Sequence, residues 1–214
     1  EKIADPTLYR LFSRKRSELD RQITMLNDRN SSKFVHGSIQ LYGISDSALV
    51  KLARTILKLE FSIATPRENL SASKVAQLAR NEIRWYSSRN RTFKATVEIR
   101  DDVNGMMVSK NKLLLGASSK FDKKRVTALL HHEIGTHILT YINGRNQPFS
   151  QLYAGLESYE EFQEGMAVLA EYLSGGLNAV RIKIIAARVI AVNSMLKKQS
   201  FQKTFSELVK TGIR

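Results

Sequence analysis

The feature that most constrains this chain is a cluster of histidines next to a glutamate. His131, His132 and His137 lie within seven residues, and Glu133 follows His132 directly. Neutral imidazole is a good zinc ligand, and a His-Glu pair followed by a second histidine is the usual order of two zinc ligands and a general base. The run from His132 to His137 therefore predicts a zinc site with Glu133 as the base. His131 is expected to lie outside the ligands, as a bystander or behind them.

The spacing of the two predicted ligands differs from that of the common zinc helix. His137 follows His132 by five positions rather than four, and on a regular α-helix such residues lie about 140° apart around the axis. A π-helical turn, whose hydrogen bonds step five residues, would bring both to one side. Gly135 is a poor helix former, so the sequence predicts an irregular turn there. The alternative is an ordinary helix on which Glu133 and His137 form a surface pair.

A catalytic zinc ion needs a third protein ligand and leaves one position open for water. No histidine follows His137, so we expect a carboxylate from the next predicted helix, which offers Glu160, Glu164 and Glu171. Small neighbours favour Glu164, since Gly165 and Ala167 would allow another helix to approach, but the residues alone do not decide. The same helix carries one apolar stripe, roughly opposite Glu164 and Glu171: Phe162, Met166, Leu169 and Leu173.

The remaining patterns predict an α+β fold, predominantly helical, with a small β-sheet before the zinc helix. Apolar residues recur with helical periodicity in seven segments: 6–26, 45–59, one starting at Ser71 or Ser73, 123–141, 159–173, 179–197 and one starting near Phe201. Short apolar or β-branched runs predict strands in four segments: 34–42, 93–99, 106–108 and 113–115.

The length of 214 residues suits one large domain or one and a half small ones, and the 43% of hydrophobic residues allows a sizeable core. With the predicted zinc site, we expect a single metallopeptidase domain over 1–214. Its helical N-terminal part would span 1–90, and the sheet with the zinc-site helices 91–214. No run approaches the roughly 20 apolar residues of a membrane span. The absence of cysteine excludes disulfides, a disulfide partner and thiolate metal ligands, and it fits a cytoplasmic protein.

The formal net charge of +14 favours polyanionic partners, such as nucleic acid or a peptide with an acidic tail. Lysine and arginine are spread along the whole chain, and no aromatic-basic RNA motif is present, which makes nucleic acid an unlikely partner. Two alternatives to an enzyme remain: a metal-binding regulatory protein without activity, and a basic nucleic-acid-binding helical domain. Glu133 argues against both, because neither needs a base beside the metal.

Two segments together resemble the microtubule-associated tyrosine carboxypeptidase (MATCAP) family, and more closely its bacterial branch named for a QEGLA motif. They read HHEIGTHILTYINGRNQPF at 131–149 and EEFQEGMAVLAEYLSGGL at 160–177. Further matching segments are DPTLYRLFSRKRSELDRQ at 5–22, IQLYG at 39–43 and MVSKNKLLLG at 107–116. Met166 stands where the branch motif has leucine. Chains of this family usually continue further, so we expect the sequence to be truncated at its C-terminus.

The resemblance implies a zinc metallopeptidase of the gluzincin kind, with one Zn²⁺ per chain. Carried over residue by residue, it implies that His132, His137 and Glu164 bind the ion and that Glu133 is the catalytic base. Eukaryotic members remove a C-terminal tyrosine from tubulin, a substrate that does not transfer to a bacterial-looking chain. The function expected here is therefore hydrolysis of peptide bonds, carboxypeptidase-like, at the C-termini of peptides or proteins.

A peptidase of this kind also needs groups that bind its substrate. One further donor to the transition-state oxyanion is expected from Tyr141, Arg145, Asn146 or Tyr159, which lie near the metal motifs in the sequence. A C-terminal carboxylate calls for a cation, and Arg145 or Lys112 would serve. The segment 110–112 is predicted as an edge strand that pairs with an extended peptide.

Overall fold

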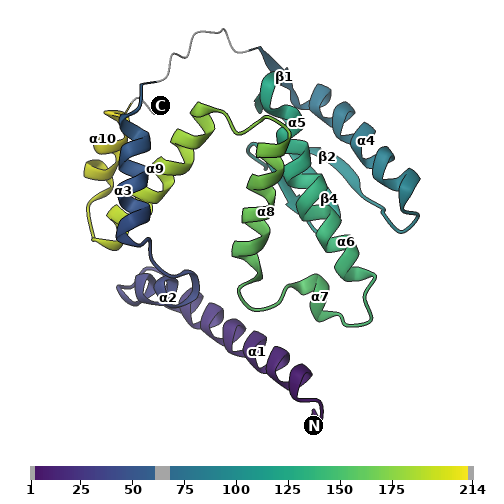
Figure 1. The fold of residues 1–214 in the computed structure, drawn as a ribbon, viewed down its shortest axis with the longest axis horizontal. Coiled ribbons are helices and arrows are strands. Elements are labelled where there is room, and N and C mark those ends of the chain that lie inside the picture. Colours follow the sequence, from purple (N-terminus) through teal and green to yellow (C-terminus); the bar gives the residue numbers. More distant parts are fainter. Residues whose placement is uncertain (1–2, 61–67, 212–214) are drawn as a thin grey trace. The chain divides into compact units, whose positions relative to one another are not determined.

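The computed structural model describes residues 3–60 and 68–211. Two compact units make up the chain: residues 63–177 form one, and residues 1–62 together with 178–214 form the other (Figure 1). Helices predominate and the sheets are small, which confirms the predicted α+β class. None of the described helices is both long enough and apolar enough to cross a membrane. That residues 1–214 act as one metallopeptidase domain, with its helical part ending at residue 90, stays a prediction.

A three-stranded sheet lies in the unit of residues 63–177. Its strands are β2 (Thr96–Arg100), β3 (Met106–Ser109) and β4 (Lys112–Gly116), in the order β2-β4-β3. β4 pairs in parallel with β2 and antiparallel with β3, which confirms the strands predicted over 106–108 and 113–115. The predicted edge strand at 110–112 is wrong, because residues 110 and 111 form the turn and Lys112 begins the central strand. The edges are β2 and β3.

Two short strands escaped the sequence patterns: β1 (Asn69–Ser71) and β5 (Lys120–Asp122), which pair antiparallel. Each leads directly into a helix and supplies its N-cap. Ser71 caps α4 (Ala72–Arg89), and Asp122 caps α5 (Lys123–His132) by accepting a hydrogen bond from a backbone N–H. This pairing therefore sets the starting points of α4 and of the helix that carries the histidines.

The predicted helix over 123–141 is longer and has three parts: α5, a π-helix η1 (Glu133–Ile138) and α6 (Leu139–Arg145). A short α7 (Gln151–Ala154) follows, and then α8 (Tyr159–Leu173) with the bounds that the sequence predicts. The chain leaves α8 through Gly175, which adopts a positive φ of 74°. Gly176 must be glycine, because a Cβ there would meet the Cβ of Ala128 on α5.

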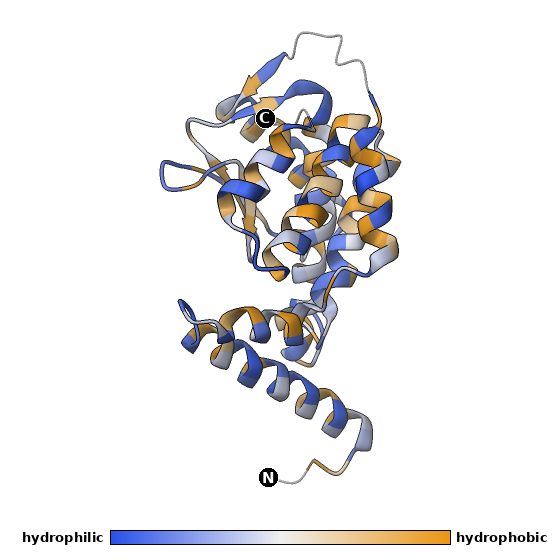
Figure 2. Ribbon diagram, turned by 90° about the vertical axis from the view of Figure 1, so that its left-hand side faces the viewer, coloured by the Kyte–Doolittle hydropathy of each residue, from blue (hydrophilic) through white to orange (hydrophobic). Residues whose placement is uncertain are grey.

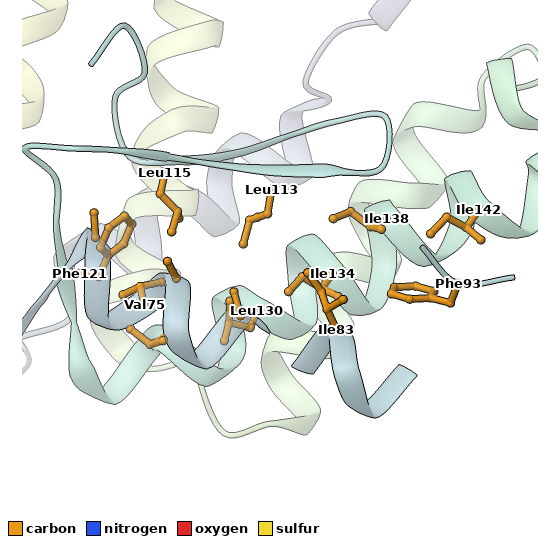
Figure 3. Packing of buried hydrophobic residues seen from close by; sticks show 14 residues of the cluster. Val75, Ile83, Phe93, Leu113, Leu115, Phe121, Leu130, Ile134, Ile138 and Ile142 are labelled. Carbon is orange, nitrogen blue, oxygen red and sulfur yellow. The ribbon is translucent and has the colours of Figure 1, made fainter. Parts of the chain in front are cut away.

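Apolar side chains from β4, β5, α4, α5, η1 and α6 form the core of this unit (Figure 3). Leu113 and Leu115 of β4 are fully buried, as are Ile134 and Ile138 of η1. Val75 of α4 lies in the same cluster. Burying one such side chain contributes about 1.5–3 kcal/mol. The histidine-bearing segment is therefore anchored by its own apolar residues inside the core.

The apolar stripe of α8 does not pack in this core. Phe162 and Leu173 are 69% and 75% exposed, whereas Ala167 and Glu171 on the other side have no exposed surface. α8 packs against α5 and η1 through this second side, because Ala167 is small enough for close approach and Glu171 finds polar partners there. Gly165 does not contribute to this close approach of the helices, since a Cβ there would have no atom within 4 Å.

All secondary-structure elements described in the second unit are helices, and hydrophilic and hydrophobic residues alternate along the helix nearest the N-terminus (Figure 2). Its helices are α1 (Pro6–Asn27), α2 (Lys33–Tyr42), α3 (Ser47–Lys58), α9 (Ala179–Leu196) and α10 (Phe201–Val209). The buried cluster joins α3 and α9 through Ala53, Leu57, Ala186, Ala187 and Ile190.

The strand predicted over 34–42 is wrong, because this segment is helix α2. Contact with α1 favours the helix: Gly37 lies against Met25, close enough that a Cβ would be 3.1 Å from the Met25 side chain. Ser38 donates its hydroxyl to the carbonyl of Phe34, one helical turn back. Gly43, with φ of 73°, ends the helix. Packing between helices thus outweighs the strand-like composition of this segment.

Candidate metal centre

The π-helix η1 begins at Glu133, immediately after His132, and includes Gly135. This confirms the irregular turn predicted from the spacing of the histidines. A Cβ at Gly135 would lie 3.0 Å from the hydroxyl oxygen of Tyr86 on α4. The Thr136 hydroxyl donates to the carbonyl of His131, a five-residue step that matches the wider π-helical turn. Glycine at this position therefore lets the turn pack closely against α4.

The wider turn brings His132 and His137 to the same side of the helix. Their ring centroids are 5.0 Å apart. Glu164 of α8 faces both rings, with Oε1 3.5 Å from Nε2 of His137 and Oε2 3.9 Å from Nε2 of His132. One ligand atom from each of the three residues lies within 4.8 Å of the other two. Such separations suit donors that surround one ion at roughly 2 Å.

The chemistry of these donors fits a metal ion. The Nδ1 atom of His132 is 2.9 Å from Oε1 of Glu171, so its proton is used there and Nε2 keeps its lone pair. The side chains of His132 and His137 are only 10% and 15% exposed, whereas that of Glu164 is 64% exposed. The group is therefore walled on the histidine side and open on the glutamate side. A metal held there would be accessible to a substrate.

Glu133 lies beside this group in an unusual electrostatic environment. Burial, together with the negative charges of Glu164 and Glu171, raises the pKa of Glu133 to about 7. Burial also lowers the pKa of His132, with a further contribution from the neighbouring His137. The imidazole of His132 is thus kept neutral, as a metal ligand must be. Glu133 is a carboxyl group that can both accept and release a proton near neutral pH.

The other residues that the sequence nominated have contacts of their own. Lys112 pairs with Glu98 at 2.6 Å, and the Asn146 amide donates to the hydroxyl of Thr92 at 2.6 Å. Arg145 lies over the ring of Tyr153, 4.8 Å from its centroid. None of these contacts involves the His132, His137 and Glu164 group. Their roles in substrate binding stay predictions.

His131 and Tyr159 lie close in the sequence to the residues of the metal-binding group: His131 directly precedes His132, and Tyr159 precedes Glu164 on the same helix. Tyr159 begins α8 and hydrogen-bonds Thr140, while burial raises its pKa. His131 has its Nδ1 atom 3.6 Å from a carboxylate oxygen of Glu82 on α4. His131 thus faces α4 and is not one of the three grouped residues, as the sequence predicts.

Sequence reasoning missed Arg125, whose guanidinium donates to Glu171 Oε2 at 2.8 Å. Glu171 itself was a candidate metal ligand, but it contacts Arg125 and the Nδ1 side of His132. The spacing of these residues in the sequence could have indicated the contact between Arg125 and Glu171. Arg125 precedes His132 by seven residues, and Glu164 precedes Glu171 by seven. Residues seven apart share a helix face, so two facing helices align these pairs.

The α+β unit of residues 63–177 thus defines a protein with a site that can hold a metal ion, built from two histidines and a glutamate. The chain belongs to the microtubule-associated tyrosine carboxypeptidase family, whose model matches residues 1–214. The family name is that of a peptidase, and membership implies carboxypeptidase-type activity for this chain. No curated protein and no solved structure gives a significant match to it.

Proposed function

We propose that this protein is a zinc-dependent carboxypeptidase-like hydrolase of peptides or proteins. The observation that carries the proposal is the π-helix, which places His132 and His137 beside Glu164 with Glu133 next to them. A helix that only carried surface histidines would have no need of this distortion. The alternatives of a regulatory metal site and of a nucleic-acid-binding domain leave Glu133 and its raised pKa without a role.

Zinc is the metal that best suits these donors. Two imidazoles and one carboxylate are a common set of catalytic zinc ligands, and the fourth position then stays open. The chain has no cysteine, so a closed thiolate site is excluded. The order of ligands, two histidines on one helix and a glutamate on the next long helix, supports a gluzincin-like arrangement. A cysteine-free chain also fits our proposal of a cytoplasmic enzyme.

Glu133 is the proposed general base and acid. A zinc ion bound by His132, His137 and Glu164 would act as a Lewis acid that polarises the scissile carbonyl and activates water. Glu133 would take a proton from the attacking water and deliver it to the leaving amine. In the metal-free chain, burial and the charges of Glu164 and Glu171 raise the pKa of Glu133, so this carboxylate has the proton affinity that both transfers require. A positioned group of this kind contributes about 10²–10⁴-fold to the rate.

For the substrate carboxylate we propose Arg145 rather than Lys112. The Lys112 ammonium is already paired with Glu98. Arg145 is exposed and stacks on Tyr153, an arrangement that leaves the edge of a guanidinium available for a carboxylate. Tyr159 and Asn146 are the proposed oxyanion donors. The net charge of +14 favours substrates with acidic tails.

Digestion of a peptide library followed by mass spectrometry tests the proposal. The expected result is loss of C-terminal residues from acidic peptides, abolished by a chelator and restored by zinc. Metal analysis of the same preparation should give about one zinc per chain. A zinc-loaded protein that cleaves no peptide would support a regulatory metal site instead. Internal cleavage would retain the peptidase and reject the carboxypeptidase assignment.

A further inference from the structure

A buried carboxylate lies behind the proposed metal centre. Glu171 of α8 has no exposed surface. Its Oε1 atom is 2.9 Å from Nδ1 of His132, and its Oε2 atom accepts a hydrogen bond from the guanidinium of Arg125 at 2.8 Å. The Arg125 side chain is 18% exposed. A carboxylate without solvent exposure is stable only when it accepts strong hydrogen bonds. Here each of its two oxygens has its own partner, Oε1 with His132 and Oε2 with Arg125.

The position of this carboxylate follows from the packing of two helices. Arg125 and His132 share a face of α5, and Glu164 and Glu171 share the facing side of α8. At its C-terminal end α8 is held close to α5, because the chain passes Ala128 at Gly176, where no Cβ fits. The helix pair therefore places one glutamate in front of His132 and the other behind it.

We propose that Glu171 is the positioning residue of His132, with Arg125 as the partner that holds the carboxylate in place. This inference rests on the zinc centre proposed above. Glu171 accepts a hydrogen bond from the Nδ1–H group of His132, fixes the ring orientation and leaves Nε2 unprotonated on the side of Glu164. A carboxylate in this relation to a ligating imidazole orients the ring and raises its basicity.

Glu171 is not a third or fourth metal ligand. Nδ1 and Nε2 lie on opposite sides of the imidazole ring, and Glu171 contacts Nδ1 whereas Glu164 approaches Nε2. The three residues whose ligand atoms gather within 4.8 Å are His132, His137 and Glu164. Two glutamates on one helix therefore have separate tasks. Glu164 faces the metal position, and Glu171 orients a ligand without touching that position.

The test is the zinc dissociation constant of Glu171→Gln, measured by competition with a chromophoric chelator. Glutamine keeps the size of the side chain and removes its charge, and its amide can also donate to Nδ1, which favours the wrong tautomer of His132. We expect zinc affinity to fall about 10–100-fold. Glu161→Gln on the exposed side of α8 is the matched control and should leave it unchanged. Equal affinities for Glu171→Gln and the unchanged protein would overturn the inference.

Cobalt substitution separates positioning from ligation. If Glu171 orients His132, the Glu171→Gln protein should keep the visible absorption band shape of the unchanged cobalt protein and lose only affinity. A change in coordination geometry would instead make Glu171 a ligand and overturn the inference. Should Glu171→Gln not fold, Glu171→Asp keeps the charge but withdraws the carboxylate by one methylene. The same loss of affinity is expected for it, and unchanged affinity would contradict the account.

Nitrogen NMR of the metal-free protein gives a readout that does not require zinc. The His132 ring should be the neutral tautomer with its proton on Nδ1, and Arg125→Met should shift the population toward the Nε2 tautomer. A ring that already carries its proton on Nε2 would refute the positioning role. If the unchanged protein binds no zinc, the proposed function fails. If it binds zinc as tightly as Glu171→Gln does, only the positioning role fails.

Discussion

The two compact units differ in how their cores are built. In residues 63–177 the core joins side chains from α4, β4, β5, α5, η1 and α6. In the unit formed by residues 1–62 and 178–214, the buried cluster joins α3 and α9 alone. The segment with both histidines belongs to the larger core, through the fully buried Ile134 and Ile138. The unit with the more extensive core is therefore the one that carries His132, His137 and Glu164, whose positions a metal ion would constrain.

This difference is the one that the proposed metal site would require of its scaffold. Productive sites require their groups to be held within about 0.5 Å, which loosely packed segments do not achieve. A π-helix is rare and occurs mostly as a single turn inside an α-helix, so we expect it to persist where surrounding packing supports it. Here the support comes from the sheet on one side and α4 on the other (Figure 3). The helical unit contains no comparable distortion among its described residues.

Matched truncations in the two cores should produce the largest difference. Leu115→Ala removes a fully buried side chain of β4, and Leu57→Ala one that is 7% exposed on α3. Leucine-to-alanine changes cost about 2–5 kcal/mol, and we expect Leu115 near the upper end because its neighbours cannot collapse. The single tryptophan, Trp85, lies on α4 and reports unfolding of this unit in urea. If both variants shifted the unfolding transition of Trp85 equally, the two cores would not differ in how much they stabilise the unit that contains Trp85.

Zinc should stabilise one unit and not the other. With free zinc at 1,000 times the dissociation constant, the stabilisation expected from mass action is about 4 kcal/mol. Hydrogen exchange should slow in α5, η1 and α8, whose residues contact the proposed ion, and stay unchanged in α3 and α9. Uniform slowing in all five helices would contradict a site confined to residues 63–177.

The metal-free protein should lose stability as the pH rises through the range in which Glu133 titrates. Its pKa is raised from 4.5 to about 7 in the folded chain, so between these values the folded state binds more protons than the unfolded state. The contribution is present below pH 4.5 and is lost as the pH approaches 7, with a size of about 3 kcal/mol. Glu133→Gln lacks it, so the variant should gain stability relative to the unchanged protein from pH 4.5 to pH 8 in chelator. A constant difference between the two proteins would refute the buried environment of Glu133.

Two glycine replacements should give the smallest effects. Alanine gains about 1 kcal/mol over glycine inside a helix. At Gly37 of α2 the new Cβ would lie 3.1 Å from Cβ and Cγ of Met25. Because α2 has no buried residue, it can shift away from α1 by the few tenths of an ångström required, so part of this gain should appear. At Gly135 it meets the hydroxyl of Tyr86, whose ring is stacked on Phe93. Gly135→Ala should therefore gain nothing or lose stability, and adding Tyr86→Phe should restore the gain. An equal gain at both glycines would show that η1 packs as loosely as α2.

The features that could be predicted from the sequence are those that depend on residues close to one another along the chain. The bounds of α8 and the irregular turn at Gly135 follow from local periodicity and from the five-residue spacing of the histidines. Features that depend on tertiary packing were missed or mistaken. The strand pair of β1 and β5 joins distant three-residue segments, and α2 is helical against its composition because it packs on α1.

The choice between Glu164 and Glu171 illustrates the same limit within the site. Both glutamates lie on one face of α8, seven residues apart, so periodicity treats them alike. Which of them approaches the Nε2 atoms depends on where α8 crosses α5, and the close contact at Gly176 fixes that crossing. The resemblance to a family selected Glu164, in agreement with the grouping of ligand atoms in the structure.

Glu133→Gln provides the most direct test of the central claim, that a zinc ion and a base beside it make this unit a peptidase. The variant should bind about one zinc per chain with unchanged affinity and release C-terminal residues about 10²–10⁴-fold more slowly than the unchanged protein. Glu161→Gln, on the exposed side of α8, is the control and should cleave normally. Undiminished cleavage by a zinc-loaded Glu133→Gln protein would contradict the account.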